Sequence, residues 1–177
     1  VTPTYELDVA VDAVSRLSVD RPDLSIVFDV YGRGDAEPAL RAQVARLGLE
    51  DRVRFHGRIP IEDVPAAVAA ADIGLAPTRR DRFTDVSLST KVFEYAAMSK
   101  PVVATRLPLV EQTFPIGTVR TYEAGDAASM AAAIAAVADD PVRRDSGVAA
   151  TLAIVRARSW EHEAIGFVAL VEGLIRR

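Results

Sequence analysis

The sequence alternates short apolar runs of strand length with segments in which apolar residues recur at helical spacing. In residues 6–19, Leu7, Val11, Val14 and Leu17 fall on one stripe, which predicts an amphipathic helix. Residues 25–30 form a run rich in branched side chains and are followed by glycines, which predicts a strand. The same reasoning predicts strands at 52–56, 72–76, 101–105 and 118–122, and helices at 36–47, 62–71, 90–98, 126–137 and 160–174, the last capped by Ser159.

Strands separated by helices imply right-handed β-α-β crossovers, and these build a parallel sheet with helices on both faces. We therefore expect an α/β, Rossmann-like, three-layer fold, with residues 1–177 forming a single domain. Ligands of such sheets bind at the carboxyl ends of the strands. The loops of interest follow Val30, Phe55, Ala76 and Thr105, and residues 78–89 form a polar segment without regular periodicity.

Composition excludes several classes of protein. The chain has no cysteine, which rules out a disulfide framework, a thiolate metal site and a cysteine nucleophile. Its net charge of −4 gives no general attraction to nucleic acid, and we expect no nucleic-acid partner. No apolar run approaches the roughly 20 residues of a membrane-spanning helix. The chain starts at Val1 without a signal sequence or an initiator Met, so we expect a piece of a longer, cytoplasmic protein.

The most informative stretch is a polar loop that runs into a helix at 90–98 and then into a buried strand. Ser89 or Thr90 can cap this helix, whose first N–H groups and dipole favour an anion such as a diphosphate. Lys91 adds a positive charge in the first turn. About one turn later, the carboxylate of Glu94 can accept two hydrogen bonds from a ribose diol. Because Ser and Thr precede many helices, these residues alone do not assign a ligand.

Four segments, in order, resemble glycosyltransferase family 4 and its relatives, the glycosyl transferases group 1. TKVFEYAAM at 90–98 with KPVVA at 100–104 is similar to that family's K-L-F-E-Y-M-A-x-G-K-P-V-V-A. VYGRGD at 30–35 resembles its strand and glycine loop, and ADIGLAP at 71–77 resembles its a-D-v-g-l-x-P segment. LGL at 47–49 with VRFHG at 53–57 is also similar. The resemblance covers nearly the whole chain, and Trp160 matches an aromatic residue that precedes the family's last helix.

The resemblance implies the C-terminal, nucleotide-sugar-binding half of a GT-B enzyme that transfers a hexosyl group with retention and without a metal. Glu94 matches the glutamate that binds the nucleotide ribose. Leu88, Ser89 and Thr90 match the loop and helix start that meet the diphosphate and the sugar, with Lys91 beside them. Arg58 and Ile59 match the stretch that edges the base. The expected ligand is a nucleoside-diphosphate sugar of the UDP or GDP type, and no separate cofactor is expected.

The chain departs from the family pattern at three places. The family's second glutamate, eight positions before the ribose-binding one, is Val86 here. Either the adjacent Asp85 substitutes for it through a small loop shift, or backbone amides alone contact the sugar, and the candidate donor-sugar contacts are Asp85, Ser87 and Leu88. Ser99 replaces the usual glycine of the A-x-G-K-P turn. The family's first strand, and the Arg/Lys pair that clamps the diphosphate, would precede Tyr5 and are missing.

The resemblance also implies partners. The acceptor would bind another Rossmann-like domain, N-terminal to this one, and a membrane would be met only through the full-length enzyme. The helix at 160–176 would pack on that missing domain, and its exposed apolar stripe predicts self-association of the chain alone. We expect weak donor binding and no measurable transfer without the other domain.

Two other functions remain open. One is half of a sugar-nucleotide 2-epimerase, which shares the GT-B architecture; the other is a non-catalytic binding or scaffold module, favoured by Val86. Gly32-Arg33-Gly34 lacks the third glycine of a dinucleotide fingerprint. Arg79, Arg80 and Arg82 favour a solvated loop over a phosphate contact, and His56 and His162, far apart in sequence, favour structural roles over a metal site.

Overall fold

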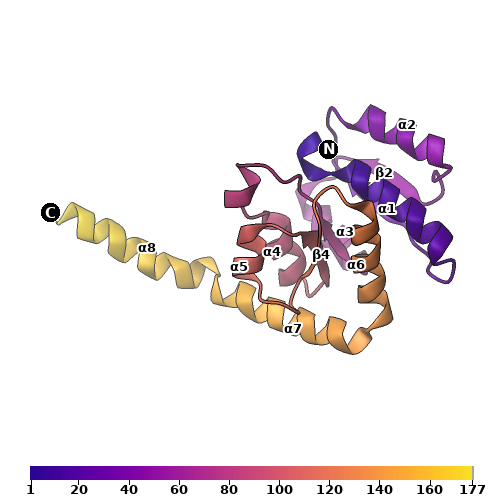
Figure 1. Cartoon of the computed structure of the whole chain (residues 1–177). Coiled ribbons are helices and arrows are strands. Elements are labelled where there is room, and N and C mark those ends of the chain that lie inside the picture. The colour runs from indigo at the N-terminus through magenta and orange to yellow at the C-terminus, as the bar shows by residue number, and fades with distance from the viewer. Residues whose placement is uncertain (177) are drawn as a thin grey trace.

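The computed structural model describes residues 1–176, in which parallel strands alternate with helices (Figure 1). β1 (Phe28–Tyr31) pairs with β2 (Val53–Gly57), and β3 (Gly74–Ala76), β4 (Val102–Thr105) and β5 (Arg120–Tyr122) pair in that order. All of these pairings are parallel, as predicted. The strands nevertheless form two sheets, since no pairing joins β1 to β3 within residues 1–176. The helices are α1 (Leu7–Asp20), α2 (Glu37–Leu47), α3 (Val64–Ala70), α4 (Thr90–Ala97), α5 (Pro108–Thr113), α6 (Ala127–Asp139), α7 (Pro141–Ala157) and α8 (Trp160–Ile175).

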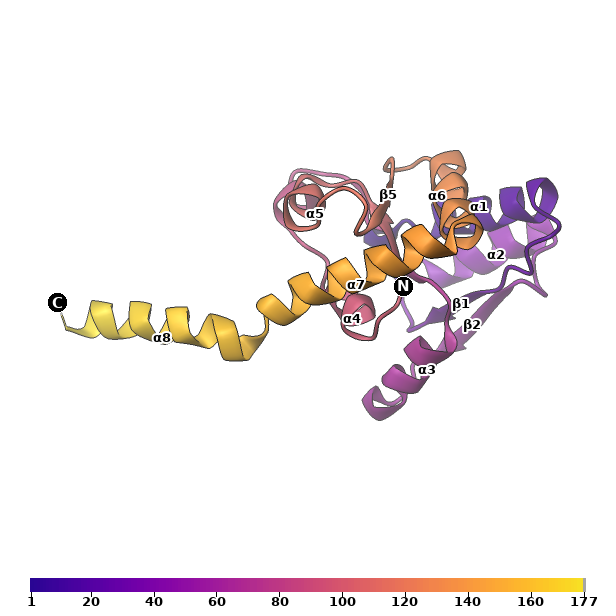
Figure 2. The same cartoon turned by 90° about the horizontal axis from the view of Figure 1, so that it is seen from below.

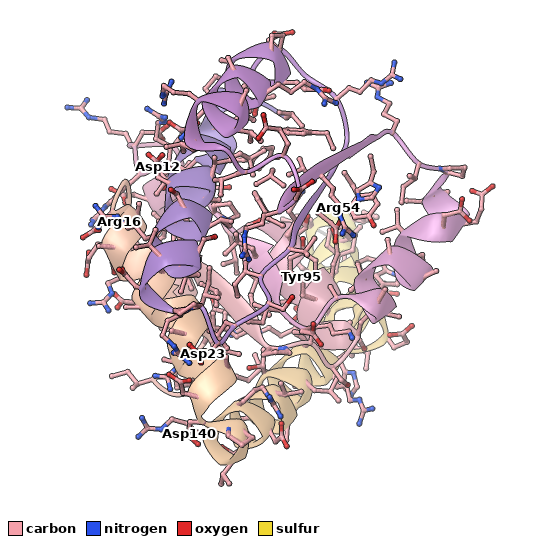
Figure 3. The ribbon with its side chains drawn as sticks, turned by 90° about the vertical axis from the view of Figure 1, so that its right-hand side faces the viewer. Asp12, Arg16, Asp23, Arg54, Tyr95 and Asp140 are labelled. Atoms are coloured by element: carbon pink, nitrogen blue, oxygen red, sulfur yellow. The ribbon has the colours of Figure 1, made fainter. Side chains whose placement is uncertain are left out.

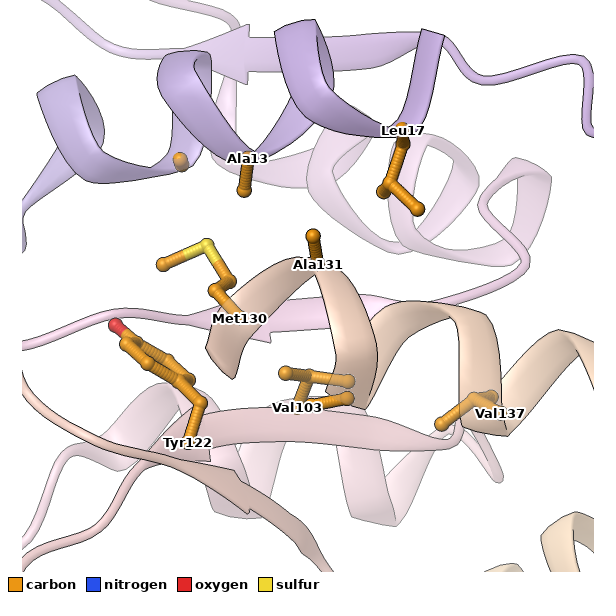
Figure 4. Close-up of a cluster of buried hydrophobic side chains, with 9 residues drawn as sticks. Ala13, Leu17, Val103, Tyr122, Met130, Ala131 and Val137 are labelled. Atoms are coloured by element: carbon orange, nitrogen blue, oxygen red, sulfur yellow. The ribbon is translucent and has the colours of Figure 1, made fainter. Parts of the chain in front are cut away.

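The central strand β4 is buried along its whole length because helices cover both of its faces. Successive side chains of a strand point to opposite faces. Val102 and Ala104 accordingly pack with residues of α4 and α5, whereas Val103 packs with Met130 of α6. Figure 4 shows α6 between α1 and the sheet, with Ala131 facing α1 and Met130 beside Tyr122. The predicted arrangement of helices on both faces of a parallel sheet is confirmed.

A separate apolar cluster joins β1 and β2 to α1 and α2. Val30 and Val53 of the strands pack against Val14 of α1 and Val44 of α2. The side chains on the opposite face of these strands, among them Asp29, Tyr31, Arg54 and His56, are exposed. α1 contacts both α2 and α6, and so the helix at the start of the chain holds the two sheets in one body. At its far end, Arg21 donates hydrogen bonds to both Asp23 and Asp139 (2.6–2.9 Å), and Figure 3 shows Asp23 beside this end of α1.

Two helices lie where the sequence pattern predicts none. α5 is short and starts at Pro108. α7 is a 17-residue helix that starts at Pro141, and the Asp140 side chain caps it by accepting a hydrogen bond from the Arg143 N–H. Only Gly147 and Thr151 of α7 are buried, so the helix lacks the apolar stripe that would reveal it. It packs closely instead, because a Cβ on Gly147 would lie 2.9 Å from the carbonyl oxygen of Gly117.

α8 leaves the body of the molecule and extends away from it as a continuation of α7 (Figures 1 and 2). None of its described residues is buried, and its large apolar side chains, such as Trp160, Phe167 and Leu174, are exposed by 56–66%. Ser159 is the N-cap residue, as predicted, but its hydroxyl makes no capping bond and contacts His162 Nδ1 at 3.0 Å. Among residues 1–176, no helix has the length and apolar character that a membrane span requires.

Candidate functional site

The first residues of the chain run along the carboxyl ends of both sheets. We call Val1–Glu6 the N-terminal strap. Val1 donates to the carbonyl of Arg33 after β1 (3.0 Å), and the Arg79 N–H, after β3, donates to the carbonyl of Thr4 (2.7 Å). Because so short a segment reaches both loops, the carboxyl ends of β1 and β3 lie on one side of the molecule. This is the side on which parallel sheets bind their ligands.

A buried carboxylate fixes the end of the strap. Glu6 is 3% exposed and has a left-handed backbone (φ 42°), a conformation that costs most residues free energy. Its Oε2 accepts a hydrogen bond from the Gly125 N–H (3.2 Å) and lies 3.5 Å from the Tyr122 hydroxyl. Burial raises the pKa of this carboxyl above its usual range, and the Gly125 N–H opposes that shift. Glu6 thus ties the strap to the carboxyl end of β5.

The same network extends across the sheet to β3. The Tyr122 hydroxyl accepts from Thr105 Oγ1 (2.8 Å), which accepts in turn from the Thr78 N–H (2.7 Å). Burial raises the pKa of the Tyr122 phenol, which therefore stays protonated and can donate toward Glu6. One chain of polar groups thus connects the ends of β3, β4 and β5. Sequence reasoning missed it, because Glu6 carries no local signal of its burial.

The start of α4 offers backbone donors. Ser89 is its N-cap residue, as predicted, with an extended backbone, but its side chain makes no capping hydrogen bond. Thr90, the first residue of the helix, is exposed, whereas Ser87, Leu88 and Ser89 are partly buried. The side chain of Asp126, in contrast, caps α6 by accepting from the N–H groups of its first turn. The first turn of α4 therefore keeps N–H groups that no side chain of residues 1–176 satisfies, together with the positive end of the helix dipole.

Two charged residues of α4 lie within about one turn of this helix start. The Nζ of Lys91 lies 5.0 Å from the centre of the Tyr5 ring in the strap. Glu94 is exposed, one turn beyond Thr90, and forms no ion pair or side-chain hydrogen bond within residues 1–176. Burial, followed by the negative charge of Glu94, raises the pKa of the neighbouring Tyr95 phenol. The structure thus leaves the Glu94 carboxylate free to accept hydrogen bonds from a ligand.

The loop between β3 and α4 is well ordered by its own polar side chains. The Asp81 carboxylate accepts from the N–H groups of Phe83 and Thr84 (both 2.8 Å), and these bonds lower its pKa. Asp85 forms an ion pair with Arg80 (2.9 Å), so its carboxylate is already engaged. Val86 is 73% exposed. The loop therefore places an apolar side chain in solvent next to the candidate donor-sugar contacts Asp85, Ser87 and Leu88.

Arg58 and Ile59 follow β2 directly, after Gly57, whose φ of 70° turns the chain. Arg58 is exposed and Ile59 is partly buried. Among residues 1–176, no hydrogen bond or ion pair links them to the start of α4. The structure therefore places these two residues at the carboxyl end of a strand, as the sequence predicts, without a direct polar contact to the α4 residues.

Both histidines have neighbours of their own. His56 Nε2 lies 2.6 Å from Asp29 Oδ1, and its ring stacks on Tyr31 with centroids 4.5 Å apart. His162 contacts Ser159 on the projecting helix. Across residues 1–176 the structure contains no group of three or more Asp, Glu or His side chains suited to a metal ion. The side chains of Arg79 and Arg80 are exposed, as expected for a solvated loop, and they contact the strap and Asp85 respectively.

The sequence matches a family model and several characterised relatives. Residues 2–140 match the model described as "Glycosyl transferases group 1". The chain is 31% identical over 159 residues to the phosphatidyl-myo-inositol mannosyltransferase of Mycobacterium leprae, covering 89% of this chain and 40% of that protein. It is 30% identical over 164 residues to a GDP-mannose-dependent phosphatidylinositol monomannoside mannosyltransferase of Corynebacterium glutamicum, covering 91% and 42%. The chain thus spans less than half the length of these relatives.

Solved structures show the same fold. The Anabaena protein HepE, in complex with UDP and glucose, superposes with a TM-score of 0.81 at 20% identity, over 100% of this chain and 46% of HepE. The C-terminal domain of the group 1 glycosyl transferase LpcC from Francisella tularensis superposes with a TM-score of 0.74 at 17% identity, covering 89% of this chain and 80% of that domain. The fold is therefore the Rossmann-like half of a GT-B protein. With the family match over residues 2–140, this chain belongs to the group 1 glycosyl transferases.

Proposed function

We propose that this chain binds the nucleoside-diphosphate sugar of a retaining, metal-independent hexosyltransferase. The observation that carries the proposal is the start of α4. The N–H groups that no described side chain caps, the Lys91 ammonium and the free Glu94 carboxylate lie there within about one turn. Backbone donors and a lysine suit a diphosphate. A carboxylate one turn later suits the two hydroxyls of a ribose.

In this proposal the leaving diphosphate is stabilised by the protein alone. Preorganised N–H donors and cations lower the free energy of a transition state in which negative charge develops on the leaving group. The first turn of α4 supplies the donors and Lys91 supplies the charge. Arg58 and Ile59 edge the base, while Leu88, Ser87 and Asp85 lie toward the donor sugar. GDP-type donors are supported by the name of the C. glutamicum relative, and UDP-type donors by the ligand of HepE.

The acceptor side of the reaction is proposed to lie in another part of a longer polypeptide. The relatives continue well beyond the matched region, which makes up 40–42% of their length. α8 presents unburied apolar side chains far from the three clusters of the domain, and we propose that it packs on the acceptor-binding part. The strand that the family pattern expects before Tyr5 would fill the break between β1 and β3. On its own, the chain is expected to bind donor weakly without transferring it.

Thermal denaturation with added nucleotide tests the proposal. A ligand that binds only the folded state stabilises it, by about 2.7 kcal/mol at a hundred times its Kd. We expect UDP or GDP to raise the Tm and ADP to raise it less. Glu94→Ala should abolish the increase without lowering the Tm of the free protein, because Glu94 is exposed and unpaired within the described residues. Glu50→Ala, which removes another exposed carboxylate remote in sequence from α4, is the matched control.

Four outcomes would contradict the proposal or a part of it. A chain that no nucleotide stabilises would favour a non-catalytic scaffold, an alternative that the exposed Val86 supports, since the family pattern expects a glutamate there. Nucleotide binding that survives Glu94→Ala would remove α4 from the site. Sugar transfer by the purified 177-residue chain would contradict the assignment of the acceptor to another domain, and inversion of C2 in a nucleotide sugar would identify an epimerase half.

A further inference from the structure

Tyr5 of the strap and Lys91 of α4 meet at the candidate diphosphate site although they are distant in the sequence. The Lys91 ammonium lies over the Tyr5 ring, 5.0 Å from its centre, within the range of a cation–π interaction. Both side chains are partly buried. Tyr5 ends the short 3-10 helix Pro3–Tyr5, directly before the buried Glu6.

The position of Tyr5 is fixed from both sides. On one side, the Thr4 carbonyl accepts from the Arg79 N–H (2.7 Å), and the Tyr5 N–H donates to the Thr2 carbonyl (3.2 Å). On the other, Glu6 accepts from the Gly125 N–H (3.2 Å) and is buried against Tyr122. The backbone that carries the ring is therefore held at the ends of β3 and β5 rather than by α4. The ring is an independent support for a side chain that α4 contributes.

The ring holds the ammonium without neutralising it. A free lysine side chain carries about 2 kcal/mol of rotamer entropy, which a ligand must otherwise overcome when it orders the chain. A carboxylate would order Lys91 but would also cancel its charge, and no ion pair of Lys91 is found within residues 1–176. An aromatic face attracts the cation through its quadrupole. The ammonium keeps its full charge and its donors on the side away from the ring.

We propose that Tyr5 is a positioning residue that preorganises Lys91 for the diphosphate of the nucleotide sugar. The inference rests on the proposed function, because it gives Lys91 the diphosphate as its ligand. It identifies the strap as part of the donor site. It also predicts that the ring matters for diphosphates and not for the nucleoside portion.

Isothermal titration of four variants with UDP, GDP and the corresponding nucleosides tests this role. Tyr5→Leu should weaken binding of the diphosphate about two- to fivefold, the loss expected for an exposed or partly exposed cation–π contact. Tyr5→Phe keeps the ring and should keep the affinity. Nucleoside affinity should be the same in all proteins. In a Lys91→Gln background, Tyr5→Leu should have no further effect on diphosphate affinity.

A second measurement separates this inference from the proposed function. The ε-methylene protons of Lys91 should show an upfield ring-current shift in NMR spectra of the free protein, and Tyr5→Leu should remove it. If wild-type chain shows this shift but binds no nucleotide, the proposed function fails. If it binds UDP or GDP and Tyr5→Leu binds equally well, the positioning role of Tyr5 is wrong while the proposed function stands. Equal losses for nucleoside and diphosphate would also overturn it, because they indicate a general structural effect.

Discussion

The ring of Tyr95 on α4 lies directly against the backbone of Gly74 at the start of β3, and a Cβ at Gly74 would overlap its ring carbons. Figure 3 shows Tyr95 among the elements at the centre of its view. This contact sets how closely α4, which carries Lys91 and Glu94, approaches the sheet.

Gly74→Ala should therefore both destabilise the domain and disturb the candidate site. Overpacking of this kind lowers the free energy of unfolding by about 1–3 kcal/mol. If α4 moved to relieve the overlap, Glu94 would move with it. Urea denaturation and nucleotide titration measure the two effects. Gly166→Ala on the exposed helix α8, where a Cβ meets nothing within 4 Å, is the control and should not destabilise. A Gly74→Ala protein as stable as wild type would show that the packing here is looser than described.

Ser99→Gly should stabilise the domain. Ser99 follows the C-cap residue of α4 and has φ 56° in a Schellman motif, in which Ser99 N–H donates to the Ala96 carbonyl and Lys100 N–H to the Tyr95 carbonyl (both 3.0 Å). A residue with a Cβ is strained in the left-handed conformation. Removing this strain should raise the free energy of unfolding by about 1 kcal/mol. The position explains why the resembling family has glycine here. Chemical denaturation measures the gain, Ser99→Val should lose stability, and a Ser99→Gly protein no more stable than wild type would contradict this reasoning.

The buried carboxyl of Glu6 should make stability depend on pH. Its pKa is raised in the folded state, so the folded protein binds more protons than the unfolded one between the two pKa values. Stability should therefore decrease as the pH rises from about 4.3, the usual value for a glutamate, through the raised pKa. Glu6→Gln should lack this component and should equal or exceed the wild type in stability at neutral pH.

Thermal denaturation of both proteins from pH 4 to pH 8, in steps of about one pH unit, gives the difference in stability that is due to Glu6. Glu50→Gln, which makes the same change at an exposed glutamate remote in sequence from Glu6, serves as the matched control. If the wild type gained stability over Glu6→Gln with rising pH, the carboxylate would be better stabilised than its burial implies, and the sign of the shift would be wrong.

The 177-residue chain should associate with itself through α8. Its apolar side chains, among them Phe167 (56% exposed) and Leu174 (63%), cover most of a helix without buried residues. Light scattering should show a mass that rises with concentration, and the double variant Phe167→Asp with Leu174→Asp should remain monomeric. Ile61→Asp is the control, since Ile61 is 81% exposed but lies far from α8 in sequence. A monomeric wild type at high concentration would count against association.

The sequence predicted most elements because their signals are local. The expected helix at 6–19 is observed as Leu7–Asp20, and the strand expected at 101–105 is Val102–Thr105. Apolar periodicity reports which face of an element is buried, and this depends only on neighbours along the chain. The start of α4 was predicted for the same reason. α7 was not, because it packs through Gly147 against backbone and has no apolar stripe.

By itself the sequence determined the α/β alternation, the parallel sense of the strands and the helix start that carries Ser89, Lys91 and Glu94. Only the tertiary structure decided that the strands divide into two sheets and that the strap crosses their carboxyl ends. It also decided that the Tyr5 ring lies beside the Lys91 ammonium and that Glu6 is buried beside Tyr122. These contacts join residues that are distant in the sequence. They form only when the loops bring the helices and strands together, and no local pattern of residues indicates which side chains will then meet.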